Sequence, residues 1–82
     1  MTAQADFAKF GLAIKVRNHY NSLRNGLTAL PHDAALDQTR RWAHKAAAGI
    51  RWAPALIDEQ LEHICYLEKA RRRRAEATYD II

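Results

Sequence analysis

The apolar residues of the chain recur at helical spacing in three stretches, which glycine and proline separate. The spacing predicts three helices and a short tail, at residues of about 3–25, 33–51, 54–78 and 79–82. We therefore expect an all-α protein, a small three-helix bundle built from helical hairpins, with residues 1–82 as a single helical domain.

The first predicted helix carries two apolar stripes rather than one. The larger stripe consists of Leu12, Val16, Tyr20, Leu23 and Leu27. Phe7, Phe10 and Ile14 lie on nearly the opposite side of the helix. Two interpretations are open. Either the helix bends near Gly11, so that both stripes face one core, or it is straight and presents one face to the core and the other to a partner.

The connections between the helices contain turn residues with a clear structural meaning. Gly26 predicts the end of the first helix, with this glycine in the left-handed conformation. Leu27 and Leu30 in the same linker are expected to cover the end of the bundle. Pro31 marks the start of the second helix and Pro54 that of the third, because proline fits the first turn of a helix.

The second and third predicted helices differ in their apolar faces. Alanine dominates the core side of the second helix, which lets a neighbouring helix approach closely. In the third helix the apolar face ends after Leu67, and the residues that follow, to Thr78, are almost wholly polar. Because they are still good helix formers, we expect the third helix to be long and to extend past the core. The apolar tail either folds back onto the bundle or docks elsewhere.

Size and composition narrow the class of protein. A chain of 82 residues buries only a thin core. Cys65 is the one cysteine, so an intrachain disulfide is excluded and a reducing compartment is favoured. The sequence has neither an apolar run long enough for a membrane span nor a recognisable signal peptide, so we expect a cytoplasmic protein. A composition rich in arginine and alanine is typical of GC-rich bacterial or phage genomes.

No pattern in the chain indicates an enzyme, a cofactor or a metal site. His63 and Cys65 point in nearly opposite directions on a helix, and no two histidines share a helical turn. Cys65 lies on the predicted core face, where a thiol is unreactive, and the histidines are expected to face solvent. Asp58, Glu59 and Glu62 lie on an exposed face with no pocket around them. We expect no catalytic residue, no metal, no cofactor and no small-molecule substrate.

A net charge of +4 keeps nucleic acid among the candidate partners. Residues 46–50 resemble the alanine–glycine–aliphatic turn of a helix-turn-helix motif. The helix that follows carries Asp58, Glu59 and Glu62 near its start, however, and their charge would repel a phosphate backbone. We therefore expect any contact with nucleic acid or with an acidic partner to be made by clusters of basic residues. These are Arg40, Arg41, Lys45, Arg51, Arg71, Arg72, Arg73 and Arg74.

Docking on another protein is the function that the sequence favours. The aromatic and aliphatic residues exceed what a core of this size can hide, and such residues on a surface usually mark association. The candidates are Phe7, Phe10, Ile14, Trp52 and Tyr66. We expect a non-enzymatic binding protein, of the kind of a bacterial or phage adaptor or inhibitor. The alternative partners are a second copy of the chain and nucleic acid. The alternative to binding is that all five residues are buried in one compact core.

Overall fold

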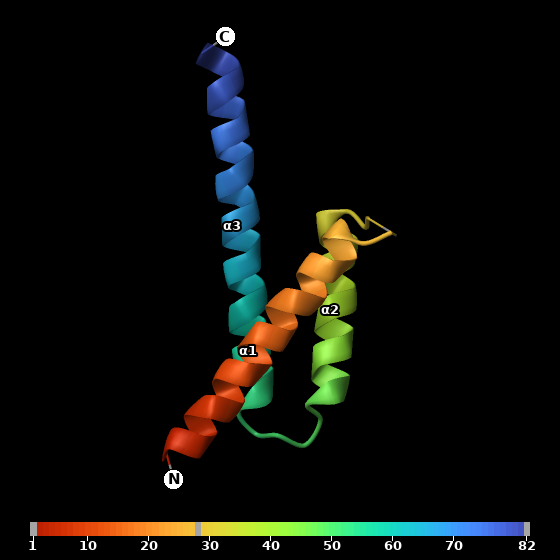
Figure 1. Cartoon of the computed structure of the whole chain (residues 1–82), viewed down its shortest axis with the longest axis vertical. Helices are drawn as coiled ribbons and strands as arrows, with labels where there is room; N and C mark the ends of the chain where they lie inside the picture. The colour runs from red at the N-terminus through yellow and green to blue at the C-terminus, as the bar shows by residue number, and fades with distance from the viewer. Residues whose placement is uncertain (1, 28, 82) are drawn as a thin grey trace.

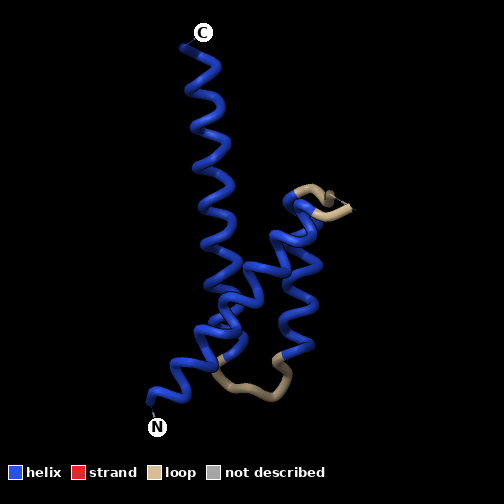
Figure 2. Tube along the Cα trace, in the orientation of Figure 1, coloured by secondary structure: helices blue, strands red, loops and turns tan. Residues whose placement is uncertain are grey.

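The structure is a computed structural model that describes the backbone of residues 2–27 and 29–81 and the side chains of residues 7–27 and 29–76. Within these ranges the chain forms three helices and no strand (Figures 1 and 2). They are α1 (Thr2–Asn25), α2 (His32–Ala46) and α3 (Ala53–Ile81). Each helix packs against both of the others, so the expected all-α three-helix bundle is confirmed. None of the described helices is both long and apolar enough to cross a membrane.

The core lies where the three helices meet. Its buried residues are Val16, Tyr20, Ala35, Ala43, Ala47, Ala53, Ile57, Leu61 and Ile64. The larger stripe of α1 supplies Val16 and Tyr20, and α3 supplies the bulkiest aliphatic side chains. α2 contributes mainly alanine, so its backbone can lie close to both neighbours, as the alanine-rich face predicts.

α3 extends well past the core. It has 29 residues where α2 has 15, and Figure 1 shows its C-terminal half standing clear of the other two helices. Residues 71–76 are all exposed, which confirms the predicted extension. The predicted end at 78 is too early, because residues 79–81 continue the helix. They do not fold back as a tail, and Ile82 lies outside the described residues.

The predicted end of the second helix at 51 is wrong, because α2 ends at Ala46. The backbone of Ala47 leaves the helical region, with φ −106° and ψ 23°, although its N–H still donates to the carbonyl oxygen of Ala43. Gly49 then adopts φ 87°, a left-handed conformation that reverses the chain and favours glycine. The sequence indicates a glycine turn at residues 46–50, but Ile50 continues the apolar period of the helix, so the end expected at 51 falls too late. Arg51 therefore belongs to the turn between α2 and α3.

The linker between α1 and α2 also differs from expectation. Gly26 is not left-handed; among the described residues of this linker it is Ala29 that has a positive φ, at 43°. Glycine is needed at position 26 for space instead, because a Cβ atom would lie 2.6 Å from the carbonyl oxygen of Ser22. Leu27 is fully exposed and covers nothing, since the helix ends before it and its side chain leaves the stripe. Leu30 does pack on the core, and its N–H donates to the carbonyl oxygen of Leu23.

Candidate functional site

The smaller apolar stripe of α1 lies on the surface. α1 runs through Gly11 without a break, so the stripe stays opposite the core face instead of turning towards it. Phe7 is 78% exposed, Phe10 66% and Ile14 41%, whereas Val16 is completely buried. Of the two interpretations of α1, the structure supports the straight helix with two apolar faces. We call Phe7, Phe10 and Ile14 the α1 stripe.

The α1 stripe ends where α1 crosses α3. One turn beyond Ile14, on the same face of α1, Arg17 donates a hydrogen bond from Nε to Oε1 of Gln60 on α3 over 2.9 Å. Figure 1 shows α1 crossing α3 obliquely, with the N-terminal end of α1 pointing away from the bundle. Arg17 therefore marks the edge of the contact between α1 and α3, and the α1 stripe lies on the N-terminal side of this edge, on the surface of α1.

The other two apolar candidates do not extend the α1 stripe. Trp52 is half-buried and packs against the core, and Nζ of Lys9 lies 6.0 Å from the centroid of its indole ring. Tyr66 is exposed, but it lies about 120° around α3 from Gln60, which faces α1. The structure thus places Trp52 in the contact between α1 and the turn, and Tyr66 on a separate face of α3.

The basic candidates are distributed over different parts of the molecule. Arg40, Arg41 and Lys45 are exposed on α2, where Arg41 pairs with Asp37 at 3.0 Å, and Arg51 lies in the turn. The run at 71–74 belongs to the projecting part of α3. Four consecutive helical residues point in four directions, so this run does not form one basic face. The structure does not join the two groups into a single stripe.

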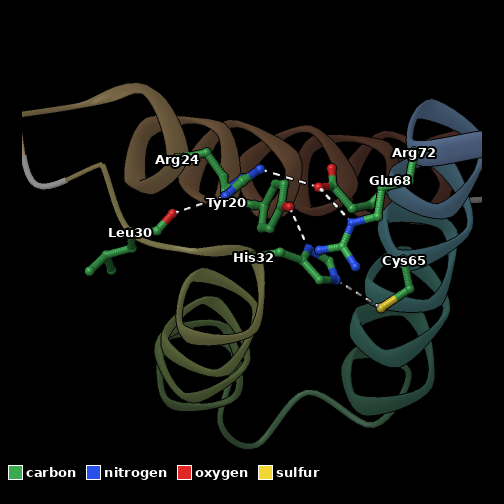
Figure 3. A network of polar contacts seen from close by, with 7 residues as sticks. All are labelled: Tyr20, Arg24, Leu30, His32, Cys65, Glu68 and Arg72. Atoms are coloured by element: carbon green, nitrogen blue, oxygen red, sulfur yellow. Dashed lines mark hydrogen bonds and ion pairs between the residues drawn. The ribbon is translucent and has the colours of Figure 1, made fainter. Parts of the chain in front are cut away.

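The structure brings together one polar cluster that the sequence did not reveal (Figure 3). His32, the first residue of α2, lies between the other two helices. Its Nδ1 atom is 2.7 Å from the hydroxyl oxygen of Tyr20 on α1, and its Nε2 atom is 3.8 Å from Sγ of Cys65 on α3. His32 and Cys65 are both half-buried, so the expectation that the histidines face solvent is wrong for His32.

An ion-pair network continues this cluster. Arg24 donates to the carbonyl oxygen of Leu30 and to Oε1 of Glu68, each over 3.2 Å, and Arg72 reaches the same carboxylate at 3.8 Å. Burial raises the pKa of the Tyr20 hydroxyl, and the charges of Glu68 and Cys65 add to this, while Arg24 and Arg71 oppose it. The Tyr20 hydroxyl therefore keeps its proton to a higher pH than an exposed tyrosine does, and the contacts of the cluster join the three helices.

The polar cluster has no clear sequence signal, because its members come from three helices and His32 and Cys65 are 33 residues apart. Helical periodicity places residues on faces but does not pair one helix with another. Among the described residues, no group of three or more His, Cys, Asp or Glu side chains could hold a metal ion. We assign the cluster a role in packing.

Comparison with protein-family models, with curated proteins and with solved structures finds no match to this chain. Function must therefore be inferred from the geometry of the molecule itself. Core packing does not explain the α1 stripe, because its three side chains are exposed on a helix whose opposite face is already buried.

Proposed function

We propose that this chain is a non-enzymatic binding protein, an adaptor or inhibitor that docks on another protein through the α1 stripe. The observation that supports the proposal most strongly is the exposure of two phenylalanines and an isoleucine along one face of a projecting helix. The composition and the single cysteine favour the cytoplasm of a bacterium or of a phage-infected cell as the place where it acts.

The spacing of the α1 stripe supports a specific mode of docking. Phe7, Phe10 and Ile14 stand at positions i, i+3 and i+7, which is the arrangement of anchor residues when an amphipathic helix binds in an apolar groove. Burying Phe7 and Phe10 contributes up to about 1.5–3 kcal/mol each, and Ile14, which is 41% exposed, contributes less; together they offset part of the cost of association. We therefore propose that α1 inserts into an apolar groove on a partner protein.

A protein partner fits the α1 stripe better than nucleic acid does. Aromatic and aliphatic side chains gain free energy by leaving water, whereas affinity for nucleic acid rests on cations that meet phosphates. The basic residues singled out from the sequence are split between α2, the turn and the far part of α3, and Asp58 and Glu59 are exposed at the start of α3. This distribution gives a phosphate backbone no continuous track to follow.

Substitution within the α1 stripe tests the proposal. Immobilised full-length protein is exposed to an extract of the source cells, with and without nuclease, and the retained proteins are identified by mass spectrometry. We expect Phe10→Asp to abolish retention of the specific partner. Leu27→Asp is the matched control, because Leu27 is equally apolar and fully exposed but lies outside the α1 stripe. Retention should survive this control and nuclease treatment.

Four results would contradict the proposal. Retention that is unchanged in Phe10→Asp would show that the α1 stripe is not the docking surface. Retention that nuclease abolishes would make nucleic acid the partner. A collapse of the circular-dichroism helix signal in Phe10→Asp would show that the α1 stripe belongs to the core. A solution mass of two chains that falls to one in Phe10→Asp would identify the partner as a second copy.

A further inference from the structure

A second surface feature lies on the other side of the crossing between α1 and α3. The two helices diverge there, and a cleft of about 290 Å³ opens between them. Residues of both helices line it, among them Arg17, Tyr20, Ile64, Leu67, Arg71 and Arg74. The α1 stripe is not part of this cleft, so the two features are separate surfaces of one molecule.

The charge of the cleft is predominantly positive. Among the residues whose side chains the structure describes, three arginines and one carboxylate, that of Glu68, line the cleft, and Arg24 lines an adjoining pocket. Glu68 already pairs with Arg24 at 3.2 Å and with Arg72 at 3.8 Å, so its charge is largely compensated. An anionic group that enters the cleft would therefore meet the guanidinium groups of Arg17 and Arg71.

The floor of the cleft is apolar. Tyr20 and Ile64 are buried at its base, and Leu67, which is nearly half exposed, forms part of its wall. Small-molecule sites usually have volumes of about 300–1,000 Å³, so the cleft is at the lower limit for a complete small ligand. It suits one apolar side chain delivered by a larger partner, with polar groups remaining at the rim.

We propose that this cleft binds an acidic helical segment of a partner protein, which places one apolar side chain on the floor and carboxylates beside the arginines of the rim. The positive charge of the cleft favours an acidic partner. The apolar floor favours a protein segment over a simple polyanion, because a polyanion has no apolar side chain to place there. The inference goes beyond the α1 stripe, because it gives the chain two independent docking surfaces, as an adaptor requires.

Two other occupants fit less well. A nucleic acid would bring a regular row of phosphates past the carboxylate of Glu68, and it would leave the apolar floor uncovered. A second copy of the chain could offer Asp58, Glu59 and Glu62 of α3. That contact would join two different surfaces, so a single such contact would build rings or filaments, and a closed dimer would require both copies to make it at once.

Titration of the isotope-labelled full-length protein tests the proposal. The probe is a short alanine-based helical peptide that carries one leucine flanked by glutamates at helical spacing. We expect its chemical-shift changes to centre on Tyr20, Leu67 and Arg71. The same peptide with lysine in place of glutamate should cause none, and binding of the glutamate peptide should weaken as salt is added.

Two double variants separate the cleft from charge in general. Arg17→Ala with Arg71→Ala removes two charges from the lining of the cleft and should weaken the peptide about tenfold, because two charge-assisted contacts are lost. Arg40→Ala with Arg73→Ala removes the same net charge away from the cleft and should leave affinity within about twofold. Phe10→Asp should leave peptide binding intact, which keeps this test independent of the α1 stripe.

Several results would overturn the proposal. Absent shift changes, changes centred elsewhere, or equal weakening by both double variants would show that the cleft is not a specific site. Displacement of the peptide by a short DNA duplex that binds the same residues more tightly would assign the cleft to nucleic acid. A solution mass that grows with protein concentration, and that the peptide reduces, would assign it to a second copy.

Discussion

The Nδ1 atom of His32 lies 2.7 Å from the hydroxyl oxygen of Tyr20, and this contact joins the first residue of α2 to the buried face of α1 (Figure 3). Nε2 of the same ring is 3.8 Å from Sγ of Cys65 on α3. A neutral imidazole can donate from one nitrogen and accept at the other, so one side chain connects all three helices. The end of the core next to the start of α2 is therefore held together by polar contacts as well as by apolar packing.

The contact between Tyr20 and His32 should be measurable as a coupling free energy. We expect Tyr20→Phe and His32→Ala each to lower the free energy of unfolding, and the double variant to lower it by less than the sum. The difference should be about 1 kcal/mol, the net contribution of one partly buried hydrogen bond. Urea unfolding followed by circular dichroism gives all four values. Strict additivity would show that the contact does not contribute to stability.

Tyr20 should also make the fold sensitive to alkali. Burial raises the pKa of its hydroxyl above the ordinary value of 10.0, so the unfolded chain releases this proton at a lower pH than the native protein does. The stabilisation is complete below about pH 10 and is lost as the pH rises through the pKa of the folded state. Urea unfolding at neutral pH and above pH 10 should show a larger loss in the wild type than in Tyr20→Phe. Equal losses would contradict this.

Gly11 is a site where stability can be gained. It lies inside α1, and a Cβ atom added there would meet nothing within 4 Å. Gly11→Ala should raise the free energy of unfolding by roughly 0.5–1 kcal/mol and the melting temperature by about 2–8 °C. Gly49→Ala is the informative contrast, since its φ of 87° should make that change destabilising by about 1–2 kcal/mol. A lower melting temperature for Gly11→Ala would indicate that α1 needs a flexible residue there.

Thr39 carries a buried hydroxyl on α2. Its Oγ1 atom has no hydrogen-bond partner within the described part of the chain, and the side chain is completely buried. Thr39→Val keeps the shape and removes the uncompensated polar atom, so stability should rise by about 1 kcal/mol. Thr39→Ser keeps the hydroxyl and removes a methyl group, and should lower it by a similar amount. Thermal unfolding compares the three proteins, and a destabilised Thr39→Val would show that the hydroxyl is satisfied.

Periodicity was a reliable guide to the helices and to their faces. It predicted α1 and most of α3, because neither contains a residue that ends the helix within its range. It failed at Gly49, because Ala47 and Ile50 continue the core register of α2 while the backbone between them turns. It failed at Leu27 for a related reason. Helical spacing predicts which face a residue lies on only within the helix, and Leu27 follows the end of α1.

The sequence predicted the α1 stripe but not the contacts between helices. The three residues stand opposite the core stripe by spacing alone, and only the unbroken course of α1 leaves them exposed. The cluster around His32 and the cleft between α1 and α3 depend on how the helices cross. Crossing angles follow from the packing of whole surfaces, which a one-dimensional pattern does not contain.

The most direct test of docking through the α1 stripe is site-specific photo-crosslinking in the source cells. Phe10 is replaced by p-benzoylphenylalanine in one sample and Leu27 in another, and the adducts formed on illumination are identified by mass spectrometry. Docking predicts a single protein adduct at position 10 that is absent at position 27. No adduct at position 10, or the same adducts at both positions, would contradict the claim that α1 inserts into a groove of a specific protein partner.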